Sequence, residues 1–338
     1  MPHRLRPRLI PIALLSAVPL VAGTLALTSV SSADAARTWS IGTAIRATAK
    51  PTPKPTASTS TTASAPKPGT LSSPALAASS PSPSTTTTTT PTYVFDDEFT
   101  GSAGTRPTDK WSYQTGGSGW GNNELESYTD RASNASLDGA GHLAITARKE
   151  TFTGSDGITR SYTSARLFSN TAVSVGWAEA RLYLPQGQGL WPAFWMLGSN
   201  ITSTGWPICG EIDAVEALNS MSTAYGTIHG PDYATNTAYS YGSSTSPSGG
   251  LAGAWHTFAV SKTTTSITWY MDGVAYYTFT KSMLGAGKAW VFDQPQYLLL
   301  NLAVGGNWPG APDATTPTTA TLLVDWVRAG TGLPPDVH

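Results

Sequence analysis

The chain after residue 92 alternates apolar and polar residues with a period of two, as β-strands do. The clearest segments are rich in β-branched and aromatic residues and lie at 143–148, 173–184, 257–260, 266–271, 297–304 and 321–327. Gly, Asn, Asp and Pro separate them, which is typical of turns between strands. Only 281–284 offers a weak helical pattern. The sequence therefore predicts an all-β domain built from many short strands.

The sharpest turn signal is Asp272-Gly273, which lies between the strand-like segments 266–270 and 275–280. An Asp-Gly pair in this setting predicts a β-hairpin. Many short strands with turn-rich spacing predict an antiparallel sandwich. Cys209 is the single cysteine, so no intrachain disulfide can form, and we expect it to pack as a small hydrophobe. Residues 93–338 are numerous enough to form one large core without disulfide bonds.

Three carboxylates, Glu211, Asp213 and Glu216, occur within an apolar, β-prone segment. In a regular strand Glu211 and Asp213 share one face, and Glu216 points to the other. One extra residue at Ala214 or Val215 forms a β-bulge and returns Glu216 to the first face. We therefore predict a row of three acids along one side of a bulged strand.

Such a row suits acid/base chemistry, because neighbouring carboxylates cannot all ionise and one proton is held to unusually high pH. Glycoside hydrolysis needs one ionised carboxylate and one protonated carboxylic acid. Strand geometry separates the Cα atoms of Glu211 and Glu216 by roughly 13 Å, and their side chains can close this to the ~5–5.5 Å of retaining enzymes. On spacing alone, a solvated or calcium-binding acidic strand fits equally well.

Further motifs surround these acids in a specific order. A Trp-Pro-Ala-Phe-Trp segment at 191–195 precedes them and Gly-Thr-Ile-His-Gly-Pro at 226–231 follows. Other motifs lie at 120–124, 128–129, 162–166, 206–210, 301–310 and 324–328. Over about residues 93–330 the chain resembles glycoside hydrolase family 16, the laminarinase-like β-glucanases. The resemblance implies an antiparallel β-sandwich of jelly-roll type, which is concanavalin A-like, with a concave substrate cleft.

The resemblance also implies roles for the three acids. Glu211 is expected to be the nucleophile, Glu216 the acid that protonates the leaving oxygen and then activates water, and Asp213 the residue that tunes both. The extra residue in the strand favours the laminarinase branch of the family over the lichenase branch. The implied activity is that of a retaining endo-β-1,3-glucanase acting on a laminarin-like polymer.

Aromatic residues are the second half of the expected sugar site, since an indole stacks on the apolar face of a pyranose. Eleven of the twelve tryptophans lie after residue 92. Trp191 and Trp195 share a face of an extended segment, and Trp120 and Trp308 lie in Gly-rich loops. Four others lie within strand patterns, and we expect most of them to be core: Trp177, Trp255, Trp269 and Trp326.

By resemblance, the substrate-binding set further includes Asn123, Arg166, His229 and Asn301. Two of them have simpler explanations: Arg166 can merely balance the acids, and His229 can be an ordinary strand histidine. The family also implies a structural Ca²⁺ that is not catalytic, held near Glu98, Gly141 and Asp325. No cofactor is expected to be required for catalysis.

The first 92 residues differ from the rest. Residues 1–35 have a basic start, an apolar run and Ala33-Asp34-Ala35, which predicts a cleaved secretory signal rather than a membrane anchor. Residues 36–92 are dominated by Thr, Ser, Pro and Ala and predict a disordered linker, with cell-wall binding as an alternative. We therefore expect a secreted, extracellular catalytic domain at 93–338, without a membrane partner once the signal is removed.

The net charge of the predicted catalytic domain limits which classes of partner it can bind. Residues 1–92 hold eight Lys/Arg and one Asp, which leaves twelve basic and twenty acidic residues in 93–338, a net charge of −8. Nucleic acid is excluded as a partner because phosphate binding needs a basic face. A neutral β-glucan fits better than a polyanionic sugar. Nothing requires oligomerisation, so we expect a monomer.

Two alternatives to the β-1,3-glucanase remain open. One is the same chemistry on mixed-linkage glucan, β-galactan or agarose, or transglycosylation in place of hydrolysis. The other is a non-catalytic β-glucan-binding protein on the same fold, which the presence of both glutamates disfavours.

Overall fold

The computed structural model describes residues 93–174, 176–335 and 337. The predicted signal and linker lie outside the described residues. No helix in the described part of the chain is long and apolar enough to cross a membrane.

The described residues form a sandwich of two sheets, as the alternating pattern predicts. The outer sheet has ten strands, in the order β15-β14-β13-β8-β17-β5-β6-β3, with β1 beside β17 and β4 beside β5. Its strands are β1 (Tyr93–Asp97), β3 (Glu126–Tyr128), β4 (Ala135–Leu137), β5 (Leu143–Thr153), β6 (Thr159–Ser164), β8 (Trp177–Tyr183), β13 (Trp255–Lys262), β14 (Ser266–Met271), β15 (Val274–Thr280) and β17 (Thr319–Gly330). All of its pairs are antiparallel except β3 with β6.

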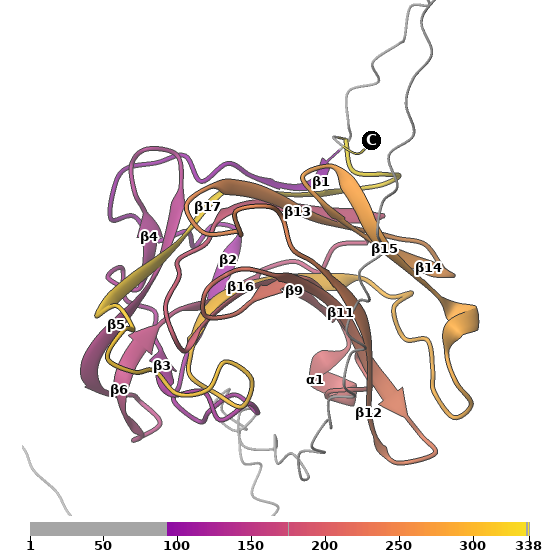
Figure 1. Ribbon diagram of the computed structural model, residues 1–338, viewed down its shortest axis with the longest axis horizontal. Coiled ribbons are helices and arrows are strands. Elements are labelled where there is room, and N and C mark those ends of the chain that lie inside the picture. The colour runs from indigo at the N-terminus through magenta and orange to yellow at the C-terminus, as the bar shows by residue number, and fades with distance from the viewer. Residues whose placement is uncertain (1–92, 175, 336, 338) are drawn as a thin grey trace, which may run out of the picture. The chain divides into compact units, whose positions relative to one another are not determined.

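The inner sheet has seven strands within the same range, in the order β12-β11-β10-β9-β16-β7-β2. They are β2 (Trp111–Gln114), β7 (Arg166–Ser169), β9 (Leu190–Gly198), β10 (Glu211–Ala217), β11 (Ala224–Asp232), β12 (Thr237–Thr245) and β16 (Gln296–Val304). Figure 1 shows this sheet bent into an arch, with β16, β9, β11 and β12 along it and β17 and β13 on its outer side. The inner sheet therefore has a concave face directed away from the outer sheet.

The main core fills the space between the two sheets. Phe194 of β9, Ile212 of β10 and Leu300 of β16 meet Phe258 and Val260 of β13 there, and none is more than 1% exposed. The alternate residues of the same inner strands face the concave side, as the period of two requires. An all-β antiparallel sandwich of jelly-roll type is confirmed.

Most of the predicted strands are present with small changes at their ends. One prediction is wrong: 173–184 is not a single strand, because β8 begins only at Trp177. Val173 exchanges backbone hydrogen bonds with Gln296 of the inner sheet, at 2.8 and 2.9 Å, whereas β8 belongs to the outer sheet. The chain crosses between the sheets after Val173, and a local apolar pattern cannot show such a crossing.

Turns and helices are short. Asp272 and Gly273 both adopt positive φ, 49° and 78°, and join β14 to β15 as the Asp-Gly signal predicts. The weak helical pattern at 281–284 corresponds to one 3₁₀ turn, η2 (Lys281–Met283). A single α-helical turn, α1 (Ile201–Thr204), was not expected.

Candidate active site

The acidic strand β10 contains the predicted bulge. Glu211 and Asp213 pair with Leu197 and Trp195 of β9, but the next paired residue is Val215, opposite Phe194. Ala214 is therefore the extra residue. Glu216 returns to the face of Glu211 and Asp213, because the bulge adds one residue to the alternation.

The bulge is stabilised from the other sheet. On the β11 side the register shifts between Asp213 and Glu216, so the bulge interrupts the ladder next to the carbonyl of Asp213. Trp269 of β14, which is fully buried, donates its indole N–H to that oxygen at 2.7 Å. A Cβ on Gly226 would lie 2.4 Å from the Trp269 ring, so only glycine leaves room for the indole. Sequence reasoning assigned Trp269 to the core but did not reveal this contact.

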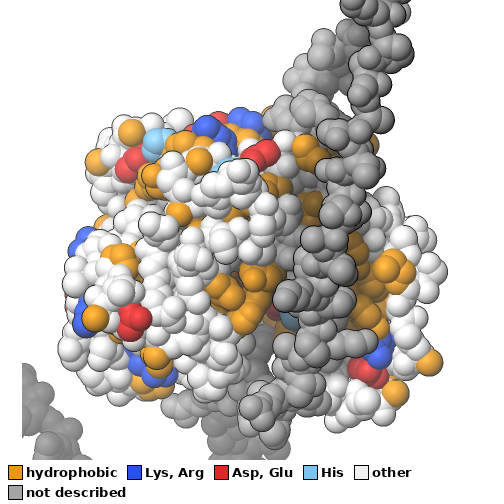
Figure 2. All heavy atoms as spheres, in the orientation of Figure 1, with side chains coloured by type: hydrophobic (Ala, Val, Ile, Leu, Met, Phe, Trp, Pro, Cys, Tyr) orange, Lys and Arg blue, Asp and Glu red, His pale blue; other side chains and the backbone are white. Residues whose placement is uncertain are grey.

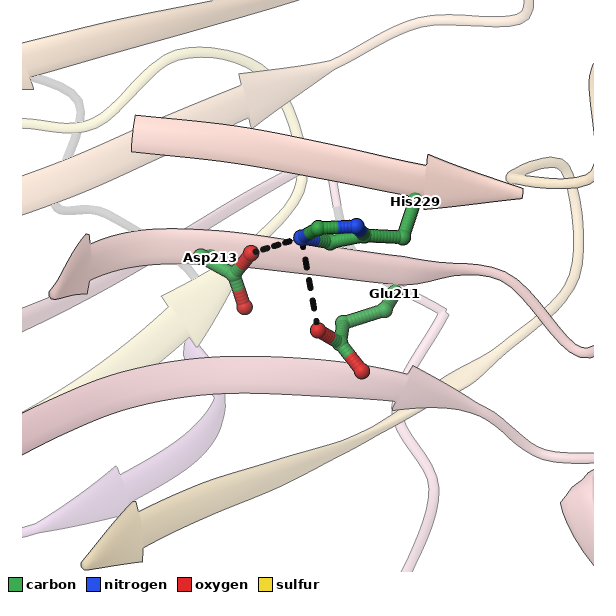
Figure 3. Close-up of side chains that lie close together, drawn as sticks. All are labelled: Glu211, Asp213 and His229. Carbon is green, nitrogen blue, oxygen red and sulfur yellow. Dashed lines mark ion pairs between the residues drawn. The ribbon is translucent and has the colours of Figure 1, made fainter. Parts of the chain in front are cut away.

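His229 of β11 stands directly across the ladder from Glu211. Its Nε2 lies 3.3 Å from Asp213 Oδ2 and 3.7 Å from Glu211 Oε1, and Figure 3 shows the three side chains converging. Burial disfavours charge on the ring, but the contact with Asp213 and the surrounding carboxylates outweigh this and raise the pKa of His229 to about 9. The histidine is therefore a cation at neutral pH and is more than an ordinary strand residue.

The two glutamates have different electrostatic surroundings. Burial and the charge of Asp213 raise the pKa of Glu211 to about 7, against the nearby positive charges of His229 and Arg166. Burial and the charge of Asp213 raise the pKa of Glu216 well above its usual range, and only His229 opposes them as a cation. Glu211 is thus the easier of the two to ionise, and Glu216 the one that retains its proton.

Glu216 lies in an aromatic corner. Trp191 donates its indole N–H to Glu216 Oε1 at 3.0 Å. The ring of Trp308 packs edge-on against Trp191 at 5.6 Å and against Tyr225 at 4.9 Å. Trp308 is 43% exposed, so it offers apolar surface to a ligand. Tyr225, which pairs with Glu216 across the ladder, was missed, although its place four residues before His229, on the same face of the strand, could have indicated it.

A second group surrounds Arg166 of β7. Its guanidinium lies over the rings of Trp120 and Trp195, at 4.7 and 4.6 Å, and donates to Gln114 at 2.6 Å. Trp195 donates its indole N–H to Asn301 at 2.8 Å. Arg166 is buried, and its charge favours ionised Glu211, so it does balance the acids and also joins two aromatic residues of the predicted site.

The network extends to carboxylates that sequence reasoning missed. The Asn301 amide donates to the hydroxyl of Tyr128 at 3.1 Å, and Tyr128 donates to Glu124 at 2.9 Å. Glu126 is fully buried and accepts the N–H of Val304 at 2.6 Å. The period-two spacing of Glu124, Glu126 and Tyr128 is the signal that could have identified this group.

Asn123 completes the predicted set through its loop. Its amide donates to Asn307 Oδ1 at 2.9 Å, next to Trp308. The structure therefore brings all of the predicted substrate residues onto, or to the rim of, the concave face with the three acids. They are Trp120, Asn123, Arg166, Trp191, Trp195, His229, Asn301 and Trp308.

Cys209 packs with Trp195 and Leu299 on the concave side and is fully buried. Burial raises the pKa of its thiol to about 12. The cysteine is therefore not a nucleophile, as expected of a small hydrophobe.

The residues implied for calcium do not offer free carboxylates. Glu98 accepts from Arg328 Nε at 2.8 Å, and Asp325 pairs with Arg181. Each carboxylate has a cationic partner, which weakens the case for Ca²⁺ at Glu98, Gly141 and Asp325. The calcium ion stays a prediction, and no catalytic step depends on it.

Glu211, Asp213 and His229 also place three ligand atoms within 4.8 Å of one another, close enough for a metal ion. The surrounding carboxylates raise the pKa of His229 to about 9, so a metal ion binding there at neutral pH would have to displace a proton. The arrangement is better suited to controlling carboxylate protonation.

Comparison with known proteins agrees with this site. Residues 122–328 match glycosyl hydrolases family 16. The chain belongs to this family. The chain is 39% identical over 254 residues to a beta-glucanase of Rhodothermus marinus, and the match covers 70% of this chain and 83% of that protein.

Solved structures resemble the family 16 domain as well. The catalytic domain of an endo-1,3-beta-glucanase (laminarinase) from Thermotoga petrophila is 40% identical, with a TM-score of 0.65, and the match covers 71% of this chain and 97% of that one. An endo-beta-1,3-glucanase from Pyrococcus furiosus is 44% identical, with a TM-score of 0.61 and coverage of 70% and 92%. The chain is thus a glycoside hydrolase by family.

Proposed function

We propose that this chain is a retaining endo-β-1,3-glucanase that cleaves a laminarin-like polymer. The observation that carries the proposal is the unequal pair of glutamates on one face of β10. Glu211 faces the cations of Arg166 and His229, whereas Glu216 holds its proton in the aromatic corner. Retaining hydrolysis requires one carboxylate of each kind.

In the first step, the Glu211 carboxylate attacks the anomeric carbon of the sugar. Glu216 gives its proton to the glycosidic oxygen, and the C–O bond to the leaving sugar breaks. The negative charge on Glu211 is consumed as the ester forms, and Glu216 is left as a carboxylate. Asp213, paired with His229, raises the pKa of both glutamates, and the charge of Arg166 beside Glu211 favours ionisation of that residue first.

In the second step, Glu216 removes a proton from water, and the oxygen attacks the same carbon from the opposite face. The ester bond to Glu211 breaks and the carboxylate is regenerated. The product keeps the original configuration because the carbon is inverted twice.

The surroundings of the acids support a neutral sugar as substrate. Indole rings line both groups on the concave face, and they stack on the C–H faces of pyranoses. Hydrophobic side chains are also exposed on the side of the molecule drawn in Figure 2. The related proteins named as endo-1,3-β-glucanases support β-1,3-glucan among neutral polymers. Secretion through residues 1–35 and action as a monomer are parts of the same proposal.

A substrate panel tests the polymer. Purified protein is incubated with laminarin, lichenan, β-1,3-galactan and agarose, and new reducing ends and product lengths are measured. Release of a range of laminari-oligosaccharides, with slower or no attack on the others, is expected. A preference for galactan or agarose, or longer products from added acceptors, would instead support the alternatives of another polymer or of transglycosylation.

Separate variants test the roles of the acids. Glu211→Gln and Glu216→Gln should each lower kcat on laminarin by at least about 10³-fold, and proton NMR should detect the β-anomer first. With an activated aryl glycoside and azide, Glu216→Ala should give the β-glycosyl azide and Glu211→Ala the α-azide. Inversion by the native enzyme, or the opposite azide products, would refute the assignment.

A further inference from the structure

The loop between β2 and β3 carries Trp120 and Asn123 in an unusual backbone conformation. Both residues have positive φ, 46° and 57°, a region that side chains other than glycine rarely adopt. Such conformations persist only where neighbouring contacts hold them. Contacts from the β5–β6 hairpin hold this loop at the rim of the concave face.

The turn of the β5–β6 hairpin lies against the start of the loop, and β3, β5 and β6 lie together at one foot of the arch (Figure 1). Asp156 Oδ2 accepts the N–H of Gly117 at 2.7 Å. Arg160 donates to the carbonyl of the same glycine through Nε at 2.8 Å and Nη2 at 2.5 Å. Two side chains of opposite charge thus hold both backbone groups of one residue.

The fit leaves little room for a side chain at either glycine. A Cβ on Gly116 would lie 3.1 Å from Asp156 Oδ2, and one on Gly117 would lie 3.0 Å from Arg160 Cγ. Asp156 also uses its other oxygen, which accepts the N–H of Ile158 at 3.0 Å and shapes the hairpin turn. One carboxylate therefore organises the turn and captures the loop.

Gly116 connects the Gly117 contact to Trp120 of the candidate sugar site. Gly116, next to the captured glycine, exchanges backbone hydrogen bonds of 3.0 Å with Tyr128, and its carbonyl accepts the indole N–H of Trp120 at 3.1 Å. Beyond it, Asn122 and Glu124 both donate N–H groups to the carbonyl of Gly119, which closes the turn that carries Asn123.

We propose that Asp156 and Arg160 are positioning residues that clamp Gly117 and so preorganise Trp120 and Asn123 for the sugar. Neither side chain touches the three acids, so they act on substrate binding rather than on the chemical step. The sugar as ligand rests on the proposed function, whereas the clamp itself does not. A preformed site binds more tightly because less loop ordering is needed on binding.

The test uses two variants and a matched control in the full chain. Asp156→Asn keeps the size of the side chain and removes the charge, and Arg160→Gln leaves the Asp156 turn intact. Ser155→Ala changes an exposed residue of the same turn. KM and kcat are measured on laminari-oligosaccharides, and amide hydrogen exchange is measured without substrate.

Each clamp variant should raise KM about tenfold with kcat changed less than twofold, since a charged hydrogen bond is lost far from the reacting atoms. Exchange at the amides of Asn122 and Glu124 should accelerate about tenfold, while Ser155→Ala behaves as native. Arg160→Lys should recover part of the effect.

Native KM and native exchange across 116–124 in both variants would overturn the proposal. Faster exchange confined to the hairpin amides of Gly154 and Gly157 would also overturn it, because the residues would then serve the hairpin alone. If native protein does not act on laminarin, the proposed function fails, and hydrogen exchange still decides on the clamp.

Discussion

Replacing Asp213 by asparagine should move the whole pH–activity profile to lower pH. Asp213 is buried beside His229, and its charge raises the pKa of both Glu211 and Glu216. Removing that charge lowers both values, so Glu211 ionises and Glu216 loses its proton at lower pH. The acid limb reports the first event and the alkaline limb the second, and both limbs shift in the same direction.

The size of the shift follows from strand geometry. Asp213 and Glu216 are neighbours on one face of β10, about two strand rises or roughly 6.6 Å apart. One unit charge at that distance, with an effective dielectric constant of about 20, is worth about 2.5 kcal/mol. At about 1.4 kcal/mol per pKa unit, the expected movement is about 1 to 2 pH units, reduced by the partial loss of charge on His229.

The assay is kcat/KM for a soluble laminari-oligosaccharide across pH 3 to about 10, with protein integrity checked by circular dichroism. Asp272→Asn is the matched control, because Asp272 forms an Asp–His pair with His256 at 2.8 Å in the outer sheet. Its positive φ also suits asparagine. Limbs that stay at their native pH in Asp213→Asn, or move upward, would refute the electrostatic reasoning.

Three further predictions concern the surroundings of the acids. Trp269→Phe should remove the indole donor to the buried carbonyl of Asp213 and destabilise the fold by about 3 kcal/mol in urea unfolding; a native midpoint would contradict this. Trp191→Phe removes a hydrogen-bond donor that favours ionised Glu216, so the alkaline limb of the pH–activity profile should move to higher pH by about one unit. Movement of that limb to lower pH would contradict this. Cys209 should react with a thiol reagent only in denaturant, because it is fully buried and its pKa is about 12; rapid reaction in buffer would disprove its burial.

Much of the fold could be predicted from the local alternation of apolar and polar residues. Strand positions such as 266–271 and the hairpin at Asp272-Gly273 follow from period and turn chemistry alone. The bulge in β10 was also predicted, because only an extra residue brings Glu216 to the face of Glu211 and Asp213. Where neighbours along the chain decide the outcome, the sequence was sufficient.

Other features depend on residues that are distant in sequence. The error at 173–184 arose because a crossing between sheets is set by pairing with Gln296, not by local hydrophobicity. Strand β12 was missed because its small polar residues lie at the edge of the inner sheet, where no apolar pattern is required.

The sequence by itself determined that Glu211 and Asp213 share one face, since side-chain alternation is a local property of the strand, and it predicted that a bulge returns Glu216 to that face. Only the tertiary structure decided that Ala214 is the extra residue, because the bulge is defined by its partners on β9 and β11. It also decided which glutamate keeps its proton. Burial and Coulomb interactions depend on distances in space, and those are set by strands far apart in the chain.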